Sequence, residues 1–410
     1  MRICLVGAAN LTNNPRLLRE ADFLAQHHDV RVVCVGSSRE AAEADARLMA
    51  RRSWRLQRVE SARADWLPSE VGRTAWFRSA FARTRRRLAE SAFRFVRSQG
   101  LAERSVCASL GELCSLAAAQ PADWFVAHTQ PALPAAAAAA AKWNARLGFD
   151  CEDLLSEMGD EFCEANRRIE KKYLARCDYI TATSNAMAEY LSKAHGVPPP
   201  VVLYNVLPLS LADGLLPPAQ RPAHTKLRLH WAGQTIGMDR GLQDAFEACA
   251  GLGDQIEIHL RGKVSDLDKA ALLAHAGRFQ IADRVHVHPR IDSDELIHSM
   301  AEHDVGLALE RHQNRNYNLT VTNKVFSYML AGLAIAATDT VGQREVLSQA
   351  PGAGILYPAG DAASLRKLLQ SWLNHPQQLA RARQAAWDAA RSRFCWDVEQ
   401  GKFAQLFAGD

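Results

Sequence analysis

Residues 318–332 carry side chains that can bind a phosphate group. Their pattern predicts a polar loop and a helix capped by Thr322, followed by a buried parallel strand over residues 333–337. Lys324 lies in the first turn of this helix, where a cation opposes the helix dipole unless an anion lies between them. Free N–H groups, a hydroxyl and an ammonium group at a helix N-terminus are typical of a phosphate or pyrophosphate site. The alternative is a surface helix with a solvated lysine.

A second group of polar residues follows predicted strands in the N-terminal half. The turn at residues 7–16 lies beyond the carboxyl end of the first strand, where open parallel sheets bind ligands, and makes Asn10 and Arg16 candidates. His128 ends a later strand at the same edge, although a histidine there is more often a packing or hydrogen-bonding residue. Four carboxylates lie within residues 150–157, and Asp150 and Glu152 are the candidates among them. These acids could instead begin the next helix, where the dipole favours them.

Other chemistries have weak support in the sequence. Asp-x-Asp occurs at residues 266–268 and 292–294, but each copy precedes a helical segment, where such residues serve as caps. His286 and His288 alternate on one predicted strand face, without a third ligand at zinc-type spacing. Gly-x-Ser-x-Gly, a Walker loop and Gly-x-Gly-x-x-Gly are all absent. We therefore expect no metal and no cofactor.

Alternating strands and helices must position these residues. The predicted strands are 3–6, 30–35, 123–128, 147–151, 178–183, 201–205, 227–232, 256–260, 285–287, 305–309, 333–337 and 355–357. Parallel strands with helices on both faces predict an α/β fold of two doubly wound, Rossmann-like domains. Prolines between residues 198 and 222 indicate the crossing between domains. The predicted parts are residues 1–206, a linker at 207–226, a second domain at 227–390, and a C-terminal helix at 391–410.

Charge is distributed unevenly along the 410 residues, whose formal net charge is +4. The segment from Arg51 to Arg104 holds 14 arginines and five acidic residues, interleaved with aromatic residues. Such a segment can bind an anionic membrane surface, and the alternative is a solvated helix face that covers the core with arginine stems. No nucleic-acid module accompanies the charge. Nine scattered cysteines, no predicted signal peptide and no transmembrane-length run favour the cytoplasm, with peripheral attachment to the inner face of a membrane.

The sequence Thr322-Asn-Lys-Val-Phe-Ser-Tyr-Met-Leu-Ala-Gly332 resembles the donor-site segment of family-4 glycosyltransferases with the GT-B fold. That family typically has Asn/Ser-Lys-Leu-Phe-Glu-Tyr-Met-Ala-Ala-Gly at this point. Ser327 replaces the family glutamate that usually holds the ribose hydroxyls, and Leu319 replaces the glutamate eight residues earlier. The resemblance covers nearly the whole chain. It implies two domains that face each other across a cleft, with the C-terminal helix crossing back to the first.

The resemblance also implies roles for particular residues. Arg240 and Lys324, with Arg261, would neutralise a nucleoside diphosphate that the N–H groups of residues 320–322 cradle. The expected donor-binding residues are Gly233, Gln234, Arg240, Arg261, Ile291, Glu310, Thr320, Val321, Thr322, Asn323, Lys324 and Ser327. The expected catalytic residues are His128, Asp150 and Glu152, and the expected acceptor-binding residues are Asn10 and Arg16.

The function that we expect is transfer of a hexosyl-type sugar, with retention, from a UDP- or GDP-linked donor to a glycan or lipid-linked acceptor. This reaction would serve surface polysaccharide or glycoconjugate biosynthesis. Two alternatives stay open. The missing glutamates favour a binding or scaffold protein that kept the fold and lost the site. A nucleotide-sugar 2-epimerase on the same fold would use Asp150 and Glu152 as acid and base.

Overall fold

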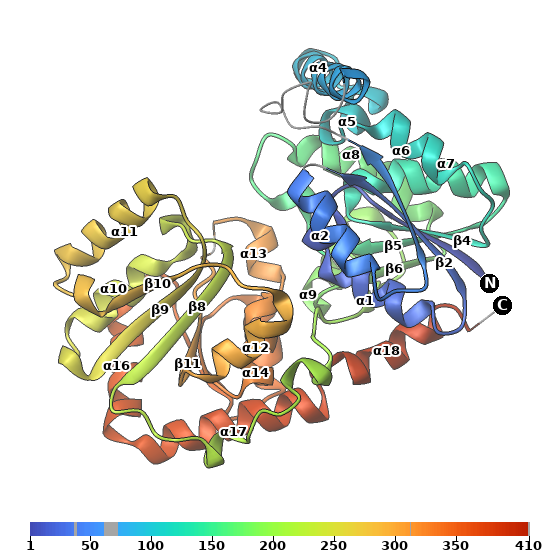
Figure 1. Ribbon diagram of the computed structural model, residues 1–410. Helices are drawn as coiled ribbons and strands as arrows, with labels where there is room; N and C mark the ends of the chain where they lie inside the picture. The colour runs from blue at the N-terminus through green and yellow to red at the C-terminus, as the bar shows by residue number, and fades with distance from the viewer. Residues whose placement is uncertain (37–38, 61–72, 312, 409–410) are drawn as a thin grey trace. The chain divides into compact units, whose positions relative to one another are not determined.

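The structure is a computed structural model that describes residues 1–36, 39–60, 73–311 and 313–408. The chain divides into two compact units (Figure 1). Unit 1 comprises Met1–Thr183 and Met187–Val202, and unit 2 comprises Ser184–Ala186 and Leu203–Asp410. Both units contain a parallel sheet with helices on its faces, which confirms the predicted α/β class.

Unit 1 is built on a seven-stranded sheet in the order β3-β2-β1-β4-β5-β6-β7. Its strands are β1 (Arg2–Gly7), β2 (Asp29–Gly36), β3 (Arg55–Glu60), β4 (Trp124–His128), β5 (Arg146–Cys151), β6 (Tyr179–Ala182) and β7 (Val201–Val202). Its helices are α1 (Pro15–Leu24), α2 (Arg39–Met49), α4 (Arg73–Phe95), α5 (Gln99–Val106), α6 (Leu110–Ala117), α7 (Leu133–Trp143), α8 (Cys163–Tyr173) and α9 (Asn185–His195). Every residue of β4 is buried, as expected for a central strand that is covered on both faces. All six strands predicted here are confirmed, although β7 is shorter than predicted, and β3 was missed.

Unit 2 is built on a six-stranded sheet in the order β10-β9-β8-β11-β12-β13. Its strands are β8 (Leu227–Thr235), β9 (Ile256–Lys263), β10 (Val285–His288), β11 (Val305–Ala308), β12 (Ala334–Thr338) and β13 (Gly354–Tyr357). Its helices are α10 (Leu242–Ala250), α11 (Asp266–Arg278), α12 (Ser293–Ala301), α13 (Arg315–Leu319), α14 (Asn323–Ala331), α15 (Val341–Ser348), α16 (Ala362–Asn374), α17 (Pro376–Ser392) and α18 (Trp396–Gln405). All six strands predicted here are confirmed.

Helix α14 is the helix predicted after Thr322, and Gly332 ends it with a φ of 70°. It packs closely on β11 because Gly306 has no side chain: a Cβ there would lie 2.2 Å from the ring of Tyr328. The Tyr328 hydroxyl donates to the Leu307 carbonyl at 3.0 Å, which fixes the helix against the strand. Thr322 occupies the cap position, but its side chain makes no capping hydrogen bond. Its Oγ1 lies 3.3 Å from Lys324 Nζ instead.

The basic segment is only partly described. Residues 61–72, including Trp66, lie outside the described residues, and the segment resumes at α4. The buried side of α4 includes Phe93, which packs with Ala102 and Ala165. Among the helices that the structure describes, none is both long enough and apolar enough to cross a membrane.

Candidate active site

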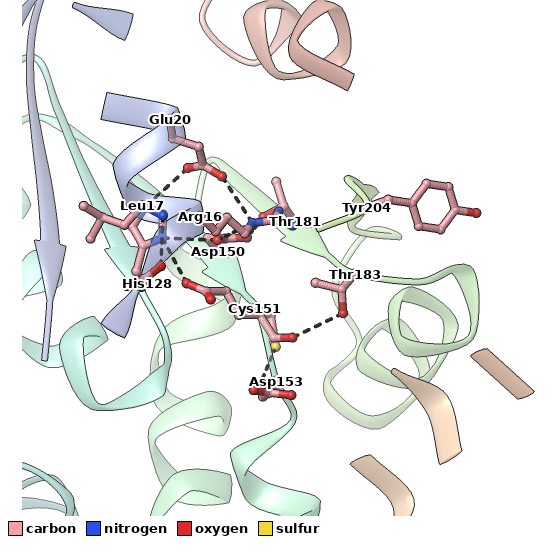
Figure 2. Close-up of polar contacts among 12 residues, drawn as sticks. Arg16, Leu17, Glu20, His128, Asp150, Cys151, Asp153, Thr181, Thr183 and Tyr204 are labelled. Carbon is pink, nitrogen blue, oxygen red and sulfur yellow. Dashed lines mark hydrogen bonds and ion pairs between the residues drawn. The ribbon is translucent and has the colours of Figure 1, made fainter. Parts of the chain in front are cut away.

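Polar side chains of unit 1 meet at the carboxyl end of its sheet (Figure 2). His128 ends β4 and is paired with Asp150 of β5, which is paired in turn with Thr181 of β6. Residues that lie opposite each other on neighbouring strands project to the same face, so these side chains converge. Arg16 and Glu20 approach from the first two turns of α1, where a spacing of four residues puts both on one helix face.

The imidazole of His128 lies between three carboxylates. Its Nε2 atom is 3.3 Å from Glu20 Oε2, and its Nδ1 atom is 3.2 Å from Asp150 Oδ2 and 3.4 Å from Glu152 Oε1. The Arg16 guanidinium donates from Nε to Asp150 Oδ2 at 2.7 Å and lies 3.2 Å from Glu20 Oε1. Each buried carboxylate thus has a cation within ion-pair distance, which offsets the cost of removing these charges from water.

The network shifts the pKa values of its members. Burial opposes the charged form of His128, but the carboxylates of Glu20, Asp150 and Glu152 outweigh it and hold the His128 pKa well above its ordinary value. Burial also opposes ionisation of Asp150, yet Arg16 and His128 lower the pKa of that carboxyl. Burial and the charge of Asp150 raise the pKa of Glu20. The surrounding carboxylates therefore favour the imidazolium form of His128.

These shifts predict how stability depends on pH. Because the pKa of His128 is higher in the folded protein than in the unfolded chain, its protonation stabilises the fold. This contribution is fully present below the pKa of the unfolded chain, about 6.5, and is lost as pH rises through the pKa of the folded protein. The raised pKa of Glu20 acts in the same direction, and the lowered pKa of Asp150 contributes stability that is lost only in acid. The free energy of unfolding, measured in urea, should therefore fall as pH rises above about 6.5, by at most about 1.4 kcal/mol per pH unit for each proton. We expect His128→Gln to flatten this slope and His375→Gln, at an exposed site, to keep it. Equal slopes in both variants would contradict the assignment.

Backbone strain marks the same edge of the sheet. Thr129, directly after His128, has φ 68° and ψ 158°, a region that residues other than glycine rarely occupy. Its N–H donates to the Asp150 carbonyl at 3.1 Å, which holds the strained turn beside the network. Strain of this kind costs of order 1–3 kcal/mol and gathers at functional sites.

The network is almost closed to solvent. The relative exposure is 0% for His128, 1% for Asp150, 2% for Arg16 and 3% for Asn10, whereas 16% of the Glu152 side chain is exposed. Of the predicted catalytic and acceptor-binding residues, only Glu152 is accessible enough to touch a substrate in this conformation. Arg16, His128 and Asp150 contact one another, and the substrate contacts of these three residues and of Asn10 stay predictions.

The same residues also resemble a metal site. Ligand atoms of Glu20, His128 and Asp150 lie within 4.8 Å of one another. Arg16 already supplies a positive charge to both carboxylates, so a cation bound there would lie against the guanidinium. The chemistry of this set fits a compensated ion-pair network better than a metal centre.

In unit 2, the predicted phosphate-binding lysine has a carboxylate partner. Lys324 Nζ lies 2.5 Å from Glu310 Oε1 and 5.5 Å from the centre of the Trp231 ring. Glu310 directly follows Leu309 at the carboxyl end of β11, and its Oε2 atom is buried without a hydrogen-bond partner among the described residues. The side chains of Lys324 and Glu310 are 19% and 15% exposed, so the pair can be reached from solvent.

Arg240 lies near the same strand end. It is exposed in the turn before α10, and its Nη1 atom is 3.4 Å from the Tyr317 hydroxyl. Gly241 adopts φ 77°, and a Cβ on it would lie 2.3 Å from the Leu309 carbonyl oxygen. This close approach holds the Arg240 turn against the residue that precedes Glu310. The turn that carries Arg240 and the Glu310 carboxylate that binds Lys324 therefore lie at the same edge of the sheet.

The backbone amides near α14 are not all free for a ligand. The Thr320 N–H donates to the Asn316 carbonyl at 2.9 Å and ends α13, which removes this amide from the predicted cradle. The amides of Val321, Thr322, Asn323 and Lys324 stay candidates, because the first N–H groups of a helix have no partner within it.

The remaining predicted donor-binding residues have varied surroundings. Ser327 is 8% exposed, and its hydroxyl donates to the Asn323 carbonyl at 3.1 Å. Arg261 donates from Nη1 to the Pro289 carbonyl at 2.9 Å, and Ile291 lies half-buried in the loop after β10. Gly233 and Gln234 lie near the end of β8, half-buried and exposed. Their binding roles stay predictions.

Sequence reasoning missed three contributors to these sites. Glu20 was detectable from its spacing of four residues from Arg16, which is typical of helical ion pairs. Thr181, whose hydroxyl donates to Asp150 Oδ1 at 2.5 Å, has no local sequence signal. Trp231 alternates with ordinary core residues along its strand and could not be told from them.

Two families match most of the chain. The family described as "Glycosyl transferase 4-like domain" matches residues 14–206, and the one described as "Glycosyl transferase-like" matches residues 243–399. No curated protein matches the sequence.

Several solved structures have a similar fold. HepE from Anabaena in complex with UDP and glucose aligns with a TM-score of 0.73 and 16% identity over the whole of both chains. Sucrose-phosphate synthase from Thermosynechococcus elongatus aligns with a TM-score of 0.70 and 14% identity over 99% of this chain and 98% of that one. The lipopolysaccharide outer core galactosyltransferase WaaB aligns with a TM-score of 0.61 and 12% identity over 99% of both chains.

Proposed function

Because this chain belongs to the family-4-like glycosyltransferases of the GT-B fold, we propose that it moves a hexosyl group from a nucleoside-diphosphate sugar to a glycan or lipid-linked acceptor. One observation carries the proposal: Lys324 lies in the first turn of α14, at the strand end that also holds the Arg240 turn. Solved HepE structures that hold UDP with glucose, or UDP-glucose, support a UDP-linked donor over a GDP-linked one.

The proposed chemistry follows from the charge of the leaving group. As the glycosidic bond breaks, negative charge grows on the departing diphosphate. The Lys324 ammonium, the Arg240 guanidinium and the first amides of α14 are placed to stabilise that charge before the reaction begins. This arrangement supplies positive charge from the protein itself, and transfer with retention follows the resemblance to family 4.

Glu310 has a separate proposed role. One of its oxygens binds Lys324, while Oε2 is buried without a hydrogen-bond partner among the described residues. A buried carboxylate oxygen readily accepts a hydrogen bond from a hydroxyl group. We propose that Glu310 accepts a hydrogen bond from a ribose or sugar hydroxyl, beside Ser327, whose hydroxyl donates to the Asn323 carbonyl.

A donor panel tests the proposal. The full-length protein is incubated with UDP-glucose, UDP-galactose or GDP-mannose, with and without lipid-linked or glycan acceptors, and products are identified by mass and anomeric configuration. We expect acceptor-dependent release of the nucleoside diphosphate and a retained anomer. An isomerised donor in the absence of acceptor would favour the epimerase. Failure of both UDP and GDP to bind would favour the scaffold protein.

The acceptor side of the proposal includes an anionic membrane. On α4, Phe81, Leu88 and Phe95 are 62%, 65% and 87% exposed, and their spacing of seven residues puts them on one face of the helix. Arg87 and Arg94 are exposed, and each directly precedes a member of this apolar stripe in the sequence. Apolar and basic side chains together on a helix surface favour the interface of an anionic bilayer. We propose peripheral attachment to the cytoplasmic face of a membrane, where a lipid-linked acceptor would be found.

Vesicle sedimentation tests this attachment. The double variant Arg87→Gln/Arg94→Gln should bind vesicles of anionic phospholipid about thirtyfold more weakly, because each arginine near such a surface contributes about 1 kcal/mol. Arg85 is not a target, since it pairs with Glu112 at 2.9 Å. The matched control is Lys269→Gln/Arg278→Gln, which removes two exposed cations from α11. Equal sedimentation of both variants and the wild type would remove the membrane from the proposal.

A further inference from the structure

Histidines gather on one face of the unit 2 sheet. His230 of β8 is paired with His259 of β9, which is paired with His286 of the edge strand β10. Paired residues of neighbouring parallel strands project to the same face, so the three imidazoles form a row across the sheet. Glu257 and His288 lie on the same face, because each is two residues from a member of the row.

The contacts within this cluster are close. The ring centres of His259 and His286 lie 4.8 Å apart, and His259 stacks on His288 at 5.2 Å with an interplanar angle of 7°. His259 Nδ1 is 3.0 Å from His288 Nε2, and His259 Nε2 is 3.6 Å from Glu257 Oε2. Ligand atoms of Glu257, His259 and His286 all lie within 4.8 Å of one another.

We propose that Glu257, His259 and His286 bind a divalent transition-metal ion of the Zn²⁺ class. In a tetrahedral zinc site with bonds of about 2.0–2.1 Å, neighbouring ligand atoms lie about 3.3–3.4 Å apart. The observed 3.6 Å between His259 Nε2 and Glu257 Oε2 needs only a small contraction to reach that value. Two imidazoles and one carboxylate are a common protein ligand set for zinc, with a fourth position left for water.

The orientation of His259 supports the assignment. Its Nε2 atom is buried and has no hydrogen-bond partner among the described residues, although it faces a carboxylate. A hydrogen bond from Nδ1 to His288 would leave the Nε2 lone pair directed at Glu257, an arrangement that a cation between them would stabilise. Metal-binding histidines almost always use the other ring nitrogen in this way.

A second buried histidine lies next to the proposed ligands. His230 is 0% exposed, and neither of its ring nitrogens has a hydrogen-bond partner among the described residues. The ring centres of His230 and His303 lie 4.4 Å apart, and those of His303 and His259 lie 4.6 Å apart. Together they give the site a buried wall of imidazoles.

Cations that now contact Glu257 must yield to the metal. Lys226 Nζ lies 3.0 Å and Arg228 Nε 3.9 Å from the Glu257 carboxylate, and these side chains are 41% and 40% exposed. Both side chains can rotate into the solvent when a divalent ion binds. Arg261 is on the same face, but its guanidinium donates to the Pro289 carbonyl. The ion would join β9 to the edge strand β10, which stabilises a strand that has a neighbour on one side only.

Metal titration of the full-length protein, after removal of bound metal by a chelator, tests this site. We expect one Zn²⁺ per chain, a rise in melting temperature with Zn²⁺, and the visible absorption of a tetrahedral site with Co²⁺. Glu257→Gln and His286→Gln, at partly exposed positions, should weaken Zn²⁺ binding at least about tenfold, and so should His288→Gln through its contact with His259. His375→Gln, an exposed histidine of the same unit, should bind as the wild type does.

Two results would overturn the proposal. One is a wild-type protein that binds no Zn²⁺. The other is retention of wild-type affinity in Glu257→Gln and His286→Gln, which would place any bound ion elsewhere. Because the readouts are binding, melting and absorption, they are independent of the proposed sugar transfer.

Discussion

Replacing Lys324 with alanine is expected to lower turnover by about a hundredfold to a thousandfold and to weaken donor binding at the same time. The ammonium group lies at the N-terminus of α14, 2.5 Å from Glu310 Oε1, where the helix dipole and free amides already favour an anion. If the diphosphate takes the place of Glu310 beside Lys324, the same charge serves both the bound donor and the transition state. Kinetics with varied donor concentration would measure both effects.

Controls separate this role from simple loss of structure. Lys269→Ala, at an exposed position of α11, removes the same charge from the same unit and should leave both constants unchanged. Lys324→Ala leaves the Glu310 carboxylate partly buried without its cation, so the variant Lys324→Ala/Glu310→Gln tests whether that carboxylate repels the donor. Unchanged kinetics in Lys324→Ala would remove Lys324 from the site.

Replacing Arg16 with methionine is expected to destabilise unit 1 by about 3–5 kcal/mol, because it removes from two buried carboxylates the guanidinium that pairs with both. Arg16 is 2% exposed and contacts both Asp150, at 2.7 Å, and Glu20, at 3.2 Å. Methionine keeps much of the volume and removes the charge. The midpoint of urea unfolding, followed by circular dichroism, would show the loss.

The matched control for Arg16 is an exposed ion pair of the same sheet. Arg55 pairs with Asp29 at 2.9 Å, but both side chains are more than half exposed. Solvent screens such pairs, so Arg55→Met should change the unfolding free energy by less than about 1 kcal/mol. A similarly small effect for Arg16→Met would mean that the buried network does not stabilise unit 1.

Much of the fold could be predicted from local patterns. The buried strands, β4 and β12 among them, are continuous apolar runs because helices cover both faces of each sheet. Helix α14 was predictable from its apolar spacing and from Gly332, which adopts the left-handed conformation that ends many helices. Strand β3 was missed because it is an edge strand in which Leu56 and Val59 are separated and flanked by polar residues.

The sites were less predictable because they depend on contacts between distant segments. Arg16 was predicted to bind the acceptor, but its buried ion pair with Asp150, which lies 134 positions later in the chain, could not be predicted. The pair of Lys324 and Glu310 depends on how α14 packs on β11, which spacing alone does not reveal. His286 and His288 lacked a third ligand in sequence, but strand pairing brings His259 and Glu257 to them from β9. Pairing across a sheet has no fixed sequence spacing.

Calorimetry with UDP and with uridine tests the central claim most directly. If the N-terminus of α14, Lys324 and Arg240 bind the diphosphate, UDP should bind the wild type at least about tenfold more tightly than uridine, and Lys324→Ala should remove most of that difference. Equal affinities for UDP and uridine, or no binding of either UDP or GDP, would contradict the account.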